Sequence, residues 1–154
     1  MGSGDGAFTL ALRDRAGPEV EIVAVDLDIQ ALRQLSESMS LQFPRTNIRT
    51  LQHDFTKPLA IDGLDGILAA NSLHYLPRPI QQNVLSEWKT MLDADGRLII
   101  VEYDTDHGNR WVPFPFSLST LASLAENAGF NSPETLNTKP SRFLGIMYAA
   151  SLRP

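Results

Sequence analysis

Three glycines at alternate positions open the chain in the stretch GSGDGA, and a helix-like sequence follows them at once. A glycine loop of this kind lets the backbone approach a ligand closely, because a Cβ at those positions would collide with it. The N-terminus of the following helix adds free N–H groups and the positive end of the helix dipole. Gly2, Gly4 and Gly6 therefore predict a loop that binds the polar part of a small molecule.

Asp26 is the acidic residue that would complete such a site. It ends the strand-like run VEIVAVD. In dinucleotide-binding folds, an acid about 20 residues beyond the glycine loop accepts hydrogen bonds from ribose hydroxyls. The glycine pattern matches both G-x-G-x-G and G-x-G-x-x-G/A. The glycine loop and Asp26 together therefore predict a nucleoside ligand. A tight turn without any ligand is the alternative interpretation.

Helical and strand-like segments alternate along the chain, and this alternation predicts the elements that would position these residues. Helices are expected over 5–15, 28–43, 79–92 and 117–130, with Asp28 as the N-cap of the second. Strands are expected over 20–26, 46–54, 97–104 and from 64 to a break near Asn71, with a turn at 93–96 and a closing antiparallel pair at 132–139 and 141–153.

These elements predict an α/β fold with a doubly wound, mostly parallel sheet, helices on both faces and an antiparallel last strand, in one domain over residues 1–154. In such a sheet, ligands bind at the carboxyl ends of the strands. Further polar residues stand at those ends. Asp54 follows the third strand in LQHDF, and Asn71, Ser72 and His74 follow the fourth in AANSLHYLP.

The order of these motifs resembles that of the class I S-adenosylmethionine-dependent methyltransferases. The resemblance runs from GSGDGA through VAVDLD, LQHDF, AANSLHYLP and MLDADGRLIIVEYD to RFLGIMYAASLR, which covers nearly the whole chain. It implies a Rossmann-like fold, S-adenosylmethionine as the cofactor and a small-molecule methyl acceptor. It also implies a first strand and one or two helices upstream of Gly2, so we expect the chain to be N-terminally truncated.

The resemblance further implies a role for each matching residue. Asp26 would hold the ribose hydroxyls, Leu27 would pack on the adenine, Asp54 would accept from the adenine amino group, Phe55 would line the ring, and Asn71 would lie beside the sulfonium. The full set of implied cofactor-binding residues is Gly2, Gly4, Asp5, Gly6, Asp26, Leu27, Asp54, Phe55, Asn71 and Ser72.

Two of the candidate residues have structural alternatives. His74 is the candidate catalytic residue, since a histidine can act as general base toward an acceptor hydroxyl or amine near neutral pH. The same pattern is equally compatible with a packed or solvent-exposed loop residue at position 74. Asp54 is a candidate adenine ligand or, alternatively, the cap of a turn before Lys57 and Pro58.

Composition narrows the function classes. The formal net charge is −5 and no basic run is present, which argues against nucleic acid and anionic membranes as partners. There is no cysteine, so we expect no thiolate metal site, no metal and a cytoplasmic protein. An NAD-dependent oxidoreductase and an inactive methyltransferase-like domain are the alternative functions. A sheet edge left by the truncation would favour a homo-oligomer.

Overall fold

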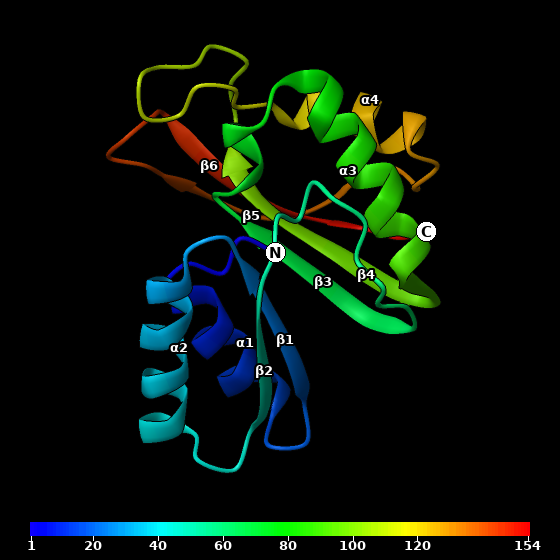
Figure 1. Ribbon diagram of the computed structural model, residues 1–154. Helices are drawn as coiled ribbons and strands as arrows, with labels where there is room; N and C mark the ends of the chain where they lie inside the picture. Colours follow the sequence, from blue (N-terminus) through cyan, green and yellow to red (C-terminus); the bar gives the residue numbers. More distant parts are fainter. The chain divides into compact units, whose positions relative to one another are not determined.

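The computed structural model describes residues 1–154 as two compact units, Met1–Lys57 and Pro58–Pro154. Each unit contains its own sheet and its own pair of long helices (Figure 1). The predicted α/β class is confirmed, and so is the antiparallel last strand. The two units are described in turn, and a single domain over 1–154 stays a prediction.

The first unit is built from two helices and two parallel strands. Its elements are α1 (Ala7–Ala16), β1 (Glu21–Asp26), α2 (Ile29–Gln42) and β2 (Asn47–Gln52). The strands pair in register from Glu21 opposite Asn47 to Asp26 opposite Gln52. Because the strands are parallel and in register, the residues that follow Asp26 and Gln52 leave the same edge of this sheet.

Helix α2 supplies most of the core of this unit. Leu32, Leu35 and Met39 are buried together with Ile22 and Ala24 of β1, as the helical spacing of the apolar residues predicts. The helix begins after Asp28, whose Oδ1 accepts from the backbone N–H groups of Gln30 and Ala31. The predicted N-cap is therefore confirmed.

Gly6 ends the glycine loop and packs directly against α2. Its φ is +98°, and a Cβ built there would lie 2.2 Å from Leu35 Cδ1. Gly4 also has a positive φ of +52°, but a Cβ there would have nothing within 4 Å. The two glycines are thus required for different reasons: close packing at Gly6, and backbone conformation at Gly4.

We expect Gly6→Ala to lower the free energy of unfolding by about 2–4 kcal/mol, because overpacking adds to the left-handed backbone penalty. Gly4→Ala is the matched control and should lower it by about 1–2 kcal/mol, since only the backbone penalty applies. Urea unfolding of both variants measures the difference. Equal losses would show that the approach of Gly6 to Leu35 does not constrain the loop.

The second unit holds a four-stranded mixed sheet. Its elements are β3 (Leu64–Ala70), the 3₁₀ turn η1 (Leu73–Tyr75), α3 (Arg78–Met91), β4 (Leu92–Tyr103), α4 (Leu118–Asn127), β5 (Glu134–Pro140) and β6 (Ile146–Leu152). The strand order is β3-β4-β6-β5. Strands β3 and β4 are parallel, whereas β6 runs antiparallel to both β4 and β5.

The predicted turn at 93–96 is wrong. Strand β4 begins at Leu92, directly after α3, and the segment 93–96 is an irregularity within the strand. Leu64 pairs with Leu92 and Gly66 with Arg97, so the β4 side holds the extra residues as a bulge. Gly96 lies close to backbone, because a Cβ there would be 2.8 Å from the Leu64 carbonyl oxygen. Gly96, which the sequence pattern assigns to a turn, instead permits this close approach of the two backbones.

The interior of this unit contains apolar side chains from the sheet and both helices. Leu98 and Ile100 of β4, Trp88 of α3 and Leu121 of α4 are buried. Helix α4 begins after Ser117, whose Oγ accepts from the Thr120 N–H. None of the helices combines the length and the apolar character that a membrane span requires.

Candidate functional site

In the first unit, the glycine loop is fastened to the end of β1. The Gly4 N–H donates to Asp26 Oδ2 at 2.7 Å, and the Asp28 N–H donates to Asp26 Oδ1 at 2.9 Å. The Ser3 N–H donates to the Val25 carbonyl at 3.0 Å. The predicted juxtaposition of the loop and the strand-end acid is therefore present, through direct hydrogen bonds.

Both carboxylate oxygens of Asp26 have a backbone partner. Each carboxylate oxygen has two acceptor positions, and one backbone N–H occupies one position on each oxygen. Asp26 is only partly buried. The buried N-terminal ammonium of Met1 also faces this carboxylate: burial lowers the pKa of that ammonium to about 6, and the attraction of Asp26 acts in the opposite direction. The implied role of Asp26 as acceptor from the two ribose hydroxyls stays a prediction.

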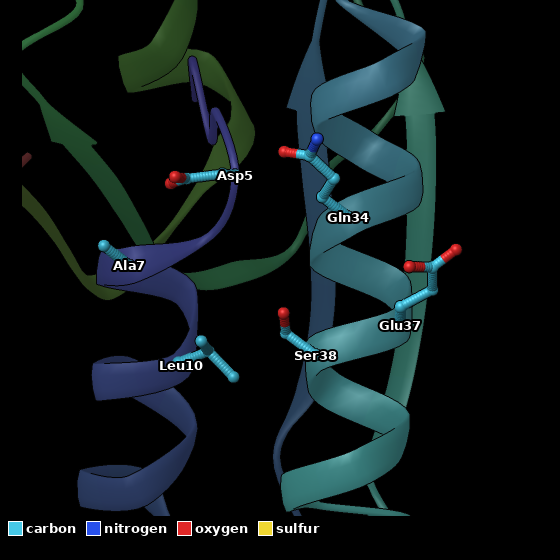
Figure 2. A pocket seen from close by; sticks show the side chains of 6 residues that line it. All are labelled: Asp5, Ala7, Leu10, Gln34, Glu37 and Ser38. Carbon is cyan, nitrogen blue, oxygen red and sulfur yellow. The ribbon is translucent and has the colours of Figure 1, made fainter.

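Asp5 lies in a different place from the Gly4–Asp26 contact. It is exposed and lines a groove of about 460 Å³ between α1 and α2. In Figure 2, Leu10 of α1 and Ser38 of α2 point into the space between the two helices. The other residues that line this groove are Ala7, Gln34 and Glu37. The implied role of Asp5 at the cofactor remains a prediction.

Asp54 caps the turn that follows it, which is the structural alternative to its role as an adenine ligand. Its Oδ1 accepts from the Thr56 N–H at 2.9 Å and from Thr56 Oγ1 at 2.7 Å. These hydrogen bonds lower the pKa of the Asp54 carboxyl below its usual value. Phe55 is half-buried, and Leu27 is 63% exposed. The implied adenine contacts of these three residues stay predictions.

The lowered pKa of Asp54 predicts a pH-dependent contribution to stability. A carboxyl whose pKa is lower in the folded state stabilises the fold above its unfolded pKa, and the contribution is lost as pH falls through the folded pKa. We expect Asp54→Asn to be less stable than wild type at pH 6, with the difference shrinking as the pH falls below the usual aspartate pKa of about 3.9. Urea unfolding across this range measures it. Asp14→Asn, at an exposed position of α1, is the control, and a difference for Asp54→Asn that does not change with pH would contradict the prediction.

In the second unit, Asn71 follows β3 in an unusual conformation. Its φ is +53°, and it is the one residue other than glycine with a positive φ. Its N–H donates to the Val101 carbonyl at 2.9 Å, which extends the pairing with β4. Its side-chain Oδ1 is buried without a hydrogen-bond partner. A strained backbone beside an unpaired buried acceptor is a pattern found at binding sites. Ser72, next along the chain, is buried.

His74 and Glu102 form a buried pair. His74 Nδ1 lies 2.8 Å from Glu102 Oε2, and the His74 N–H donates to Glu102 Oε1 at 3.2 Å. His74 is 2% exposed and Glu102 is 1% exposed. The His74 ring also lies against the rings of Tyr75 and Tyr103, with centroids 4.3 and 5.6 Å away.

This pair has a definite chemical consequence. A carboxylate that accepts from the Nδ1–H of a neutral imidazole fixes the tautomer, and Nε2 is then the nitrogen that can accept a proton. The carboxylate also stabilises the imidazolium that forms. His74 is therefore placed in the second unit with the partner that a general base requires.

Sequence reasoning placed Glu102 at a strand end but missed its pairing with His74. The signal was present, because the parallel pairing of β3 with β4 brings Ala70 opposite Val101. Residues just beyond Ala70 and Val101 then leave the same edge of the sheet. Sequence reasoning also missed Gln81, which is fully buried in α3.

Comparisons with known proteins agree with these observations. Residues 1–96 match the family model described as a methyltransferase domain. No curated protein matches the chain.

Solved structures share the fold at low sequence identity. A putative O-methyltransferase from Nostoc punctiforme has a TM-score of 0.81 and 18% identity, over 99% of this chain and 50% of that one. The mitomycin 7-O-methyltransferase MmcR has a TM-score of 0.75 and 19% identity, over 99% and 47%. A pericyclic reaction enzyme has a TM-score of 0.73 and 18% identity, over 99% and 41%. The chain spans about half the length of these structures.

Proposed function

Because the chain belongs to the methyltransferase-domain family, we propose that it transfers the methyl group of S-adenosylmethionine to a hydroxyl of a small-molecule acceptor. Family membership supports the cofactor. The observation that carries the acceptor chemistry is the buried pair of His74 with Glu102. The net charge of −5 supports a small acceptor over a nucleic acid.

The residues present fit the cofactor. A Cβ at Gly4 would meet no atom within 4 Å. The partly buried Asp26 carboxylate, which also attracts the Met1 ammonium, is of the acceptor type that ribose hydroxyls need. Asn71 Oδ1 is a buried acceptor that lacks a partner. We propose that Gly4 and Asp26 hold the nucleoside. A role for Asn71 beside the sulfonium is what the family resemblance implies.

The role of His74 follows from the fixed tautomer. S-Adenosylmethionine supplies an electrophilic methyl group on a positively charged sulfur. With the cofactor bound, a new bond from the acceptor oxygen to that carbon would replace the carbon–sulfur bond, whose electron pair would stay on sulfur. His74 Nε2 takes the hydroxyl proton, and Glu102 stabilises the imidazolium. The products are the methyl ether, S-adenosylhomocysteine and one proton on His74.

The two contributions of the protein differ in size. Holding the acceptor and the methyl group in line contributes roughly 7–11 kcal/mol to lowering the barrier. A positioned general base adds about 10²–10⁴-fold to the rate. Orientation therefore lowers the barrier more than the general base does. The contribution of His74 applies to acceptors that must lose a proton.

Calorimetry with S-adenosylhomocysteine and with NAD tests the proposal. We expect S-adenosylhomocysteine to bind and NAD not to bind. Binding of NAD alone would favour an oxidoreductase. Binding of neither would favour a domain that has the fold without the chemistry. Either of these two results overturns the proposed function.

A further inference from the structure

Gln81 is a polar residue at a core position of α3. Its exposed fraction is 0%, in a helix whose other fully or nearly fully buried residues include Val84, Leu85, Trp88 and Met91. A buried amide is stable only when its N–H and carbonyl groups are hydrogen-bonded. The partners of Gln81 therefore indicate why an amide occupies this position.

The Gln81 side chain connects two segments far apart in sequence. Its Nε2 donates to the Leu73 carbonyl at 3.1 Å and to the Phe114 carbonyl at 2.8 Å. Its Oε1 accepts from Arg78 Nη1 at 2.9 Å. Leu73 begins the turn η1, and Phe114 lies in the loop between β4 and α4. One amide thus uses both donors and its acceptor to join the turn, the loop and its own helix.

His74 lies inside this set of bonds. The Phe114 N–H donates to the His74 carbonyl at 2.9 Å. The hydrogen bonds from Gln81 to Leu73 and Phe114, and from Phe114 to His74, thus close a ring that runs through the backbone of His74. The acceptors in this set of hydrogen bonds include the carbonyl of Leu73, just before His74, and the carbonyl of His74 itself. Glu102 contacts the imidazole at Nδ1.

The same loop is held a second time by Arg78. Its Nη2 donates to Asp106 Oδ1 and to the Pro115 carbonyl, both at 3.2 Å. Asp106 in turn accepts from Ser117 Oγ at 2.7 Å. These contacts are more exposed than those of Gln81, since the Arg78 side chain is 40% exposed. Arg78 thus holds Pro115, next to Phe114, and Asp106 near the start of the loop, whereas Gln81 holds Phe114 itself and the turn that contains His74.

We propose that Gln81 is a positioning residue that holds the His74 turn and the Phe114 segment at a fixed separation on the acceptor side of the site. The inference rests on the proposed function for the role of His74. Tyr75 and Phe114 are 61% and 43% exposed, so each of the two segments joined by Gln81 carries an exposed aromatic side chain, and the Tyr75 ring lies against that of His74. Loss of the amide leaves the hydrogen bond from the Phe114 N–H to the His74 carbonyl as the direct link between the two segments, and so weakens their connection without touching the proton acceptor.

The test compares Gln81→Leu with Gln82→Leu in the same helix. Gln82 also donates to a backbone carbonyl, that of Leu124 at 3.2 Å, but it is bonded to neither the turn nor the loop. We expect exchange of the Phe114 amide hydrogen to be at least about tenfold faster in Gln81→Leu than in Gln82→Leu. The ¹⁵N signals of the His74 ring should shift in Gln81→Leu alone. Affinity for S-adenosylhomocysteine should stay within about twofold of wild type in both variants.

Unchanged Phe114 exchange and His74 signals in Gln81→Leu, or equal changes in Gln82→Leu, would overturn the inference. Should Gln81→Leu fail to fold, Arg78→Lys serves as the second variant, because lysine lacks the fork that bonds Gln81 and the loop together. It should accelerate Phe114 exchange in the same direction, and no acceleration would count against the inference. Absence of S-adenosylhomocysteine binding in the wild type would contradict the proposed function but leave the exchange comparison valid.

Discussion

Replacing His74 by glutamine is expected to slow methyl transfer by about 10²–10⁴-fold, the usual contribution of a general base. Glutamine can still donate a hydrogen bond to Glu102, so the buried carboxylate keeps a partner, but its amide cannot take a proton. Affinity for S-adenosylhomocysteine should change by less than about twofold, since His74 acts on the acceptor. The measurement is transfer of a labelled methyl group from S-adenosylmethionine to a panel of small phenols and alcohols.

His107→Gln is the matched control, because His107 is exposed in the loop between β4 and α4. It should transfer methyl groups at the wild-type rate. Glu102→Gln should also slow transfer, because an amide at this position can stabilise the wrong tautomer of His74 and cannot stabilise the imidazolium. Wild-type rates in both His74→Gln and Glu102→Gln would show that the pair is only a structural contact.

Replacing Asp26 by asparagine is expected to weaken S-adenosylhomocysteine binding by about 10–100-fold. The amide has one acceptor oxygen where the carboxylate has two, so it cannot serve the Gly4 N–H, the Asp28 N–H and a ribose together. The lost charge-assisted hydrogen bond amounts to about 1.5–3 kcal/mol, which corresponds to this range. Calorimetric titration of the variant measures it.

Asp28→Asn is the control for this experiment. Asparagine is as good an N-cap as aspartate, so α2 and the affinity should be unchanged. An affinity for Asp26→Asn equal to that of wild type would confine Asp26 to a structural role in tying the glycine loop to β1.

Much of the fold could be predicted because its signals are local. The apolar spacing of Leu32, Leu35 and Met39 and the capping residue Asp28 lie within one segment, and each is where the pattern predicts. The bulge at 93–96 could not be predicted in this way. It depends on how β3 and β4 pair across the sheet, and the glycine there has the same local signature as a turn.

The candidate site was predictable in type and only partly in geometry. The loop and Asp26 came together as expected, because strand ends in an α/β sheet meet at one edge. The sequence does not distinguish Gly6, which packs against Leu35, from Gly4, which leaves open space. The partner of His74 is Glu102, which lies 28 residues away on β4. Only the pairing of β3 with β4 therefore identifies it.

The most direct test of the account is an NMR titration of the ¹⁵N-labelled chain with S-adenosylhomocysteine. The account predicts saturable shifts of the backbone amides of Gly4 and Asp28, with NAD causing none. Shifts confined to other residues, or no shifts at millimolar ligand, would contradict it.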